Sequence, residues 1–213
     1  MGLSRRVFMG ASLSVATASV LAVTNVAEAS AKKPQKWDKT VNVVIIGSGG
    51  AGLATAVSAA ERGVKDIVVL EKLAFLGGNT AIATGAFNTA DPKQKEQGIE
   101  DSPEFHAQQT LKGGDFRGNP DLVNELTHNA YDTLKWLESK GVKFQPKILQ
   151  VYGALWPRSH ATAASKGSDY VRVLSEEAKK LGVTIQTQAK VVDIIRENQL
   201  SGRVLGNLCT KGG

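Results

Sequence analysis

Cysteine is almost absent from this sequence: Cys209 is the only one among 213 residues. A single thiol excludes an internal disulfide, a Cys-x-x-Cys redox pair and a Cys-x-x-Cys-His haem-attachment site. Any haem that serves this protein would therefore belong to another chain.

Metal-ligand clusters and nucleophile motifs are also lacking. Only three histidines occur, and no spacing of His, Cys or carboxylate residues fits a metal site. No Gly-x-Ser-x-Gly run is present, so hydrolase and metalloenzyme functions are excluded. His106 and His128 lie in helical, polar surroundings that are typical of surface or packing roles.

A concentrated basic surface is not apparent either. The 26 Lys and Arg residues are interspersed with 20 Asp and Glu, which gives a formal charge of +6. No stripe of basic and aromatic residues and no nucleic-acid-binding motif accompanies this charge, so we expect no nucleic-acid partner. The 42% hydrophobic content is sufficient for a buried core.

The first 31 residues have the pattern of an export signal. A paired-arginine start, SRRVF, precedes a short run of small apolar residues that ends in Ala-x-Ala near Ala29 and Ala31, the two candidate cleavage positions. The pattern favours the twin-arginine type over ordinary secretion, although Gly10 replaces the usual basic residue. The alternative to a cleaved export signal is an uncleaved membrane anchor. If the signal is cleaved, we expect no stable membrane span in the mature chain.

The remainder divides into a polar linker at residues 32–40 and one domain at residues 41–213. The segment Val41–Ile46, which is apolar except for Asn42, predicts a strand buried on both faces. The run GSGGAG follows at once and leads into a predicted helix at residues 51–62. In this context Gly47 permits a tight turn, Gly49 allows the backbone to approach a pyrophosphate, and Gly52 allows close helix packing.

A second predicted strand, Ile67–Leu70, ends at Glu71, about twenty residues beyond the glycines. A carboxylate at this place can accept both ribose hydroxyls of an adenosine and would repel a 2′-phosphate. The pattern therefore predicts dinucleotide binding and disfavours NADP, while NAD and FAD both remain open.

The segment after Glu71 leads into a second glycine-rich turn at residues 77–85, which a plain NAD domain does not have. Its GGNT and ATGAFN runs resemble the FAD-binding domain of the fumarate reductase and succinate dehydrogenase flavoproteins, particularly the soluble periplasmic flavocytochrome c branch. The resemblance continues through the runs DSP, KGG, NPDLV, WL, GV, RSH and KVV, and covers essentially all of the mature chain. It implies FAD as the cofactor.

The resemblance also implies the cofactor-binding residues. The first glycine turn would face the pyrophosphate, the end of the second strand the adenosine, the second turn the ribityl chain and flavin edge, and a later strand the adenine. In that order, the residues are Gly47, Gly49, Gly50, Ala51 and Gly52; Glu71 and Lys72; Gly78, Asn79, Thr80, Thr84 and Gly85; and Val191.

Asn79 departs from the membrane-bound relatives. Those proteins attach flavin covalently through the histidine of a Ser-His-Thr run, whereas the matching run here is Gly78-Asn79-Thr80. Asparagine cannot form that bond, so we expect non-covalent FAD.

The resemblance implies a fumarate reductase-type oxidoreductase that reduces fumarate, another dicarboxylate or a related enoate in the periplasm. Its electrons would come from a separate cytochrome c or a quinol-linked donor. The family's catalytic arginine and histidines lie in a later capping domain, so we expect an N-terminal part without catalytic residues that binds FAD weakly. Arg158 and His160 are the candidates for contact with substrate, although a structural role is more typical of them.

Two alternatives remain open: a non-catalytic exported remnant or FAD-binding module, and a relative that acts on urocanate or a ketosteroid. The predicted fold is α/β, namely a Rossmann-like FAD-binding domain with a parallel sheet, a helical insertion and a small β-meander, without the capping domain. Further helices are predicted at residues 121–139 and 169–181, and further strands at 183–187, 191–196 and 203–208.

Overall fold

The computed structural model describes residues 34, 36–198 and 201–211. The predicted signal peptide, residues 1–31, lies outside the described residues, so it stays a prediction. The described chain forms two compact units, one that contains Lys36–Val192 and one that contains Asp193–Asn207.

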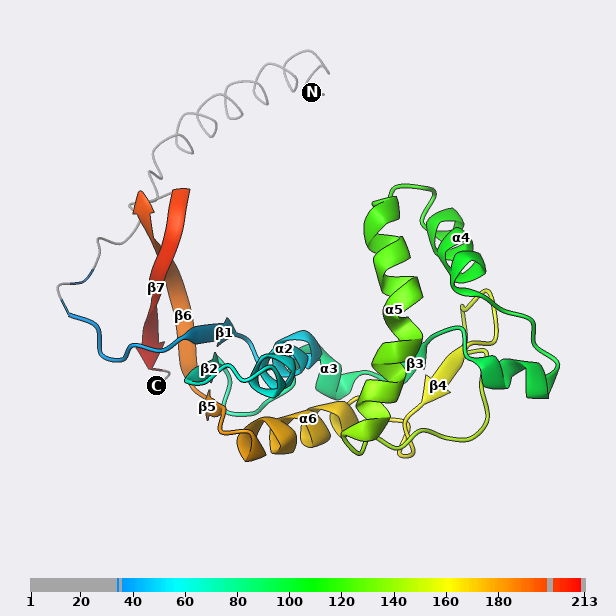
Figure 1. Ribbon diagram of the computed structural model, residues 1–213, viewed down its shortest axis with the longest axis horizontal. Helices are drawn as coiled ribbons and strands as arrows, with labels where there is room; N and C mark the ends of the chain where they lie inside the picture. The colour runs from blue at the N-terminus through cyan, green and yellow to red at the C-terminus, as the bar shows by residue number, and fades with distance from the viewer. Residues whose placement is uncertain (1–33, 35, 199–200, 212–213) are drawn as a thin grey trace, which may run out of the picture. The chain divides into compact units, whose positions relative to one another are not determined.

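A parallel sheet organises the larger unit (Figure 1). Strands β1 (Val43–Ile46), β2 (Ile67–Leu70) and β5 (Thr184–Gln186) lie in the order β1-β2-β5. Val43 pairs with Ile67 and Val68 pairs with Thr184, both in parallel register. The predicted α/β fold with a parallel sheet is confirmed.

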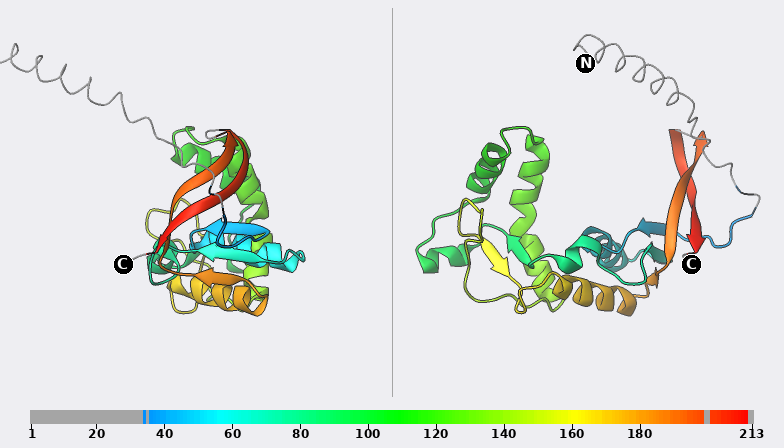
Figure 2. Two further views of the ribbon diagram at one scale, coloured as in Figure 1. Left: turned by 90° about the vertical axis from the view of Figure 1, so that its left-hand side faces the viewer. Right: turned by 180° about the vertical axis from the view of Figure 1, so that it is seen from behind.

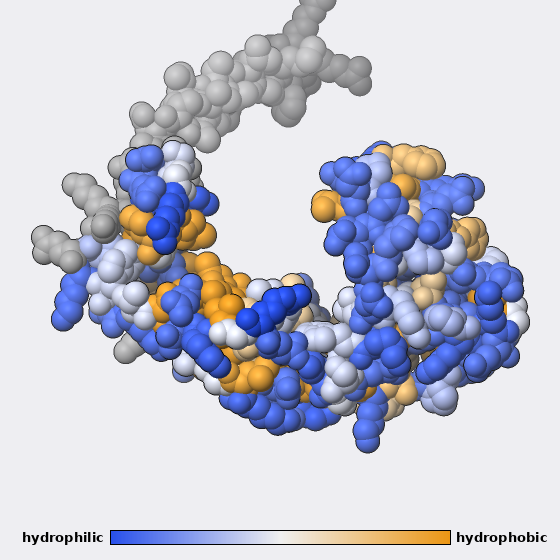
Figure 3. Space-filling model, in the orientation of Figure 1, coloured by the Kyte–Doolittle hydropathy of each residue, from blue (hydrophilic) through white to orange (hydrophobic). Residues whose placement is uncertain are grey.

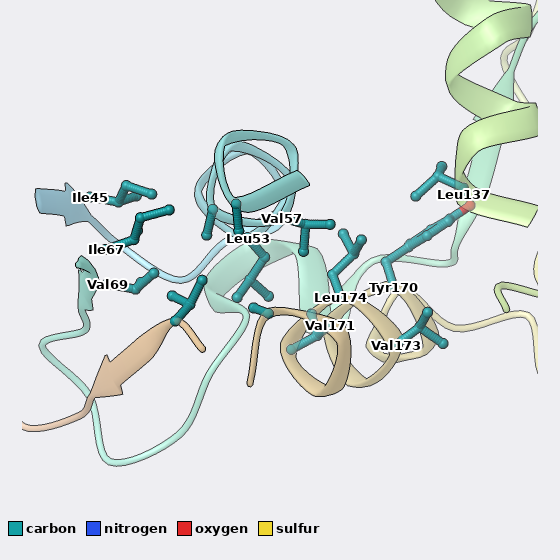
Figure 4. Close-up of a cluster of buried hydrophobic side chains, with 14 of the residues drawn as sticks. Ile45, Leu53, Val57, Ile67, Val69, Leu137, Tyr170, Val171, Val173 and Leu174 are labelled. Atoms are coloured by element: carbon teal, nitrogen blue, oxygen red, sulfur yellow. The ribbon is translucent and has the colours of Figure 1, made fainter. Parts of the chain in front are cut away.

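Two helices, α2 (Gly50–Glu61) and α6 (Ser168–Lys180), bury the same face of this sheet. Figure 4 shows side chains of α2 and α6 directed toward one another beside those of the strands. This core includes Ile45, Leu53, Val57, Ile67, Val69, Val171 and Leu174. Burial of such side chains stabilises the fold by about 1.5–3 kcal/mol each, so this apolar layer holds the first glycine turn in place.

The other face of β1 is less covered than the sequence predicts. Val44 is 39% exposed and Ile46 is 52% exposed, so the strand is covered on one face only, the face of Ile45 and the half-buried Val43. The expectation of burial on both faces is therefore wrong for the described chain, because α2 and α6 both pack on the opposite face. Figure 3 shows apolar surface gathered over the region of β1 and β2.

A small antiparallel pair and two short helices carry the chain away from the sheet. Helix α3 (Gly78–Ile82) is followed by β3 (Ala86–Asn88), which pairs with β4 (Ser159–Ala161). A 3-10 helix, η1 (Pro92–Gln97), begins at Asp91, whose side chain accepts a hydrogen bond from the Lys93 amide. These elements were not predicted, because each is too short to show a periodic pattern.

Helices α4 (Pro103–Gly113) and α5 (Pro120–Ser139) form the helical insertion and lie side by side in both views of Figure 2. Ser102 and Asn119 cap them through side-chain hydrogen bonds, and a proline occupies the first turn of each. Along α5, Ala130, Leu134 and Leu137 of the predicted apolar face are buried, whereas Leu122 and Leu126 are exposed.

Strands β6 (Ala189–Asn198) and β7 (Ser201–Lys211) form a two-stranded sheet. They extend the predicted strands at residues 191–196 and 203–208, and part of the predicted turn between them, residues 199–200, lies outside the described residues. The structure thus has a two-stranded ribbon at the place of the predicted meander.

Candidate functional site

The first glycine turn joins β1 to α2 and brings the start of the helix very close to the end of the strand. Gly47 has a φ of +95°, in the left-handed region that favours glycine. A Cβ at Gly52 would lie 2.0 Å from the Gly47 carbonyl oxygen, so any side chain there would displace the helix from the strand. The predicted roles of these two glycines in the turn and in helix packing agree with this geometry.

The N-terminus of α2 is open to a ligand. No side chain caps it at Gly49, and no acidic residue lies in its first turn. The Gly50 amide donates to Thr80 Oγ1 at 2.9 Å. The amides of Ala51 and Gly52 lie in the first turn, where an α-helix supplies no partners of its own. Amide donors and the helix dipole together favour an anion at this point.

Glu71 is buried at the end of β2 and is held by its own chain. Its Oε2 accepts hydrogen bonds from the Ser48 amide at 3.0 Å and from the Ser48 hydroxyl at 2.6 Å. Its Oε1 accepts from the Leu73 amide at 2.9 Å. Burial alone would raise the pKa of Glu71, but the hydrogen bonds from Ser48 and Leu73 outweigh burial and hold this pKa below its usual value. The carboxylate is therefore ionised at neutral pH.

Ser48 connects the two glycine turns, a role that was not predicted from the sequence. Its hydroxyl donates to Glu71 and accepts from the Gly77 amide at 3.1 Å, and its side chain is fully buried. Gly49 and Gly77 also form a parallel backbone bridge. One hydroxyl thus joins the first turn, the carboxylate and the second turn. A serine within a glycine run is expected simply because it is small, so no local sequence signal indicates this role.

The second turn presents one open side and one packed side. Asn79, Thr84 and Ile82 are exposed, and Ile82 is 83% exposed. Gly85 is buried and has a φ of +77°. The predicted residues of this turn therefore lie along a single short segment, with Asn79 and Thr84 available to a ligand.

The start of β6 runs alongside the end of β2. The Ala189 amide donates to the Glu71 carbonyl at 2.8 Å, and the Gln188 amide donates to the Leu73 carbonyl at 3.0 Å. Val191 packs against the apolar cluster that contains Val68 and Leu70. The structure thus brings the segment of Val191 to the same edge of the sheet as Glu71.

Arg158 and His160 belong to a separate buried polar network. The Arg158 Nε and Nη2 atoms donate to the two Asp101 carboxylate oxygens at 2.9 and 2.8 Å. His160 Nε2 lies 3.1 Å from Asp91 Oδ2, and its Nδ1 lies 3.3 Å from the Phe87 carbonyl oxygen. Both side chains are engaged by carboxylates of their own chain, an arrangement typical of a structural role.

The other two histidines differ in environment. His128 is exposed and its Nε2 lies 3.2 Å from a Glu104 carboxylate oxygen. His106 is buried, and its Nδ1 has no hydrogen-bond partner. Burial, with a smaller effect of the Arg158 charge, lowers the pKa of His106 to about 4, so its imidazole is neutral at pH 7.

Within residues 34, 36–198 and 201–211, no group of three or more His, Cys, Asp or Glu residues is placed to hold a metal ion. In the same part of the chain, no helix combines the length and apolar character needed to cross a membrane.

Residues 42–212 match the family described as FAD binding domain. Among curated proteins, the chain is 36% identical to the acrylate reductase flavoprotein subunit of Shewanella woodyi, over 96% of this chain and 40% of that protein. It is 35% identical to urocanate reductase of Eggerthella lenta, over 89% of this chain and 34% of that protein. The chain thus spans two fifths or less of the length of these relatives.

Solved structures show the same likeness. An open conformation of a flavocytochrome c3 fumarate reductase has a TM-score of 0.73 and 27% identity, over 88% of this chain and 36% of that one. The 3-ketosteroid-delta4-(5alpha)-dehydrogenase of Rhodococcus jostii has a TM-score of 0.70 and 26% identity, over 85% of this chain and 44% of that one.

Proposed function

Because the chain belongs to the FAD-binding domain family and FAD is thus its cofactor, we propose that its two joined glycine turns form the FAD site. The observation that carries this proposal is the Ser48 hydroxyl, which links the first turn to Glu71 and to Gly77. FAD contains both a pyrophosphate and a flavin. Its site therefore needs one protein segment against each group, here the first and the second glycine turn, held at a fixed separation.

The pyrophosphate would rest on the N-terminus of α2, where Gly49, Gly50, Ala51 and Gly52 bring the backbone close. Gly50 already donates to Thr80, so the amides of Ala51 and Gly52 are the donors we assign to the phosphate oxygens. The N-cap residue, Gly49, has no side chain that could compete for these two amides, which supports this assignment.

Glu71 would hold the adenosine ribose. An ionised carboxylate offers about four acceptor positions, and Ser48 and Leu73 fill three of them. We therefore assign a hydrogen bond from a single ribose hydroxyl to Glu71, which refines the expectation of two. Lys72 and Val191 lie beside it, where Val191 would contact the adenine through its backbone.

The flavin end would lie along the second turn, on the exposed side of Asn79 and Thr84, with Gly78, Thr80 and Gly85 shaping the backbone. Asn79 cannot form the covalent link that a histidine would form, so the cofactor would be held non-covalently.

We further propose that the chain is the FAD-binding part of an oxidoreductase that reduces fumarate or a related enoate. The names of the relatives support this reaction class, since they include reductases of acrylate, urocanate and fumarate. When bound, FAD supplies hydride-transfer chemistry. The residues of this chain would bind and orient it, and Arg158 and His160 would stabilise the supporting structure.

The electron donor would be a separate cytochrome c or a quinol-linked protein, which is consistent with the single cysteine, Cys209, among these 213 residues. The paired arginines support export to the periplasm by the twin-arginine route. The alternative function, a non-catalytic FAD-binding module, is favoured by the engagement of Arg158 and His160 with Asp101 and Asp91.

The test combines FAD titration of the purified 213-residue chain with assays of reduced viologen oxidation by fumarate, acrylate and urocanate. We expect saturable FAD binding and no turnover by this chain alone. Leu122→Ala, an exposed position on α5, serves as the control and should bind FAD normally. Absence of saturable binding would overturn the proposed site, and turnover would contradict the assignment of no catalytic role to these residues.

A further inference from the structure

The packed side of the second glycine turn rests on the beginning of α6. A Cβ at Gly77 would lie 2.6 Å from Val171 Cγ2, and a Cβ at Gly167 would lie 1.9 Å from the Thr80 carbonyl oxygen. The Gly167 amide also donates to the Ala83 carbonyl at 2.8 Å. Backbone and side chains of α6 therefore support this turn along its length.

Tyr170 makes the most specific of these contacts. Its hydroxyl donates to the Gly85 carbonyl at 2.8 Å, in a buried position. The same carbonyl accepts the Thr162 amide at 3.2 Å, so two donors fix its direction. Burial raises the pKa of Tyr170, which keeps the hydroxyl protonated and able to donate.

The backbone of Gly85 is also constrained by close packing, in addition to this hydrogen bond. Its φ of +77° and the approach of Lys166, whose carbonyl carbon would lie 2.7 Å from a Cβ, place the backbone in a close fit. Thr84, the neighbour of Gly85, is exposed. The direction of the Gly85 carbonyl is therefore coupled to the backbone conformation at this end of the turn, and so to the position of Thr84.

We propose that Tyr170 is a positioning residue for FAD, because it fixes the Gly85 carbonyl and with it the turn that faces the flavin. This inference rests on the proposed FAD site. Without the hydroxyl, the turn would populate other conformations, and the measured dissociation constant rises in inverse proportion to the competent fraction. A competent fraction reduced to about one fifth would raise the dissociation constant of FAD about five-fold.

The test compares Tyr170→Phe with Ser175→Ala in the full chain. Ser175 lies on the same helix and its hydroxyl donates to the Arg172 carbonyl at 3.1 Å, so its loss is a matched deletion remote from the turn. We expect Tyr170→Phe to raise the FAD dissociation constant about five-fold, to shift the absorbance band of the bound flavin, and to speed amide hydrogen exchange at residues 83–86. Ser175→Ala should change none of these.

A wild-type dissociation constant and flavin band in Tyr170→Phe would overturn the proposal, even if thermal stability fell. If the wild-type chain bound no FAD, the proposed function would fail separately. The exchange measurement would then still decide the positioning role, since unchanged exchange at residues 83–86 in Tyr170→Phe would refute it.

Discussion

Replacement of Ser48 by alanine should strongly destabilise the site region. The change removes the hydroxyl that donates to the ionised Glu71 and accepts from the buried Gly77 amide. A hydrogen bond to a charged group contributes about 1.5–3 kcal/mol, and an unpaired buried donor costs about 1–3 kcal/mol. Because Glu71 keeps its two amide donors, we expect a loss of about 3–5 kcal/mol in the free energy of unfolding.

Urea denaturation followed by far-UV circular dichroism measures this loss. With a urea slope of about 1–3 kcal/mol per molar, the midpoint should fall by roughly 2 M. Thr55→Ala is the matched control, because its exposed hydroxyl donates only to the Ala51 carbonyl within α2, and its effect should stay within about 0.5 kcal/mol. A loss below about 1 kcal/mol for Ser48→Ala would refute the reasoning that this hydroxyl joins the two turns.

Three further predictions concern packing, charge and pH. Gly52→Ala should abolish FAD binding in a titration, because its Cβ would lie 2.0 Å from the Gly47 carbonyl oxygen; wild-type affinity would contradict the tight turn. Asp101→Asn should lower the free energy of unfolding by about 3–5 kcal/mol in urea, since it leaves the buried Arg158 charge uncompensated. His106 has a pKa of about 4 when folded and about 6.5 when unfolded. The unfolded state therefore binds the proton first, and stability falls by about 2–3 kcal/mol between pH 7.5 and 4.5. His106→Leu should remove this part of the pH dependence, and an unchanged slope would exclude His106 as its source.

The elements that were predicted well are those with a strong local signal. The strand Ile67–Leu70 has its predicted bounds, and α2 and α6 begin and end within one residue of prediction. Continuous β-branched runs, a glycine turn and helical periodicity supply these signals. The covered face of β1 was not predictable, because a strand's sequence does not specify which neighbours pack on it.

The features that could not be predicted from the sequence depend on contacts between residues that are distant along the chain. Arg158 and Asp101 are 57 positions apart, and neither position carries a local sign of the ion pair. Ser48 was overlooked for the same reason, since its partner Glu71 is 23 positions away. Glu71 itself was identified because the end of a second strand at that distance from a glycine turn has a known chemical use.

The most direct test of the FAD site is amide hydrogen exchange of the full chain with and without saturating FAD. If the two joined turns hold the cofactor, FAD should slow exchange at residues 47–52 and 77–85 and leave the helical insertion at residues 103–139 unchanged. Saturable binding without protection at either turn, or protection confined to the insertion, would contradict the account.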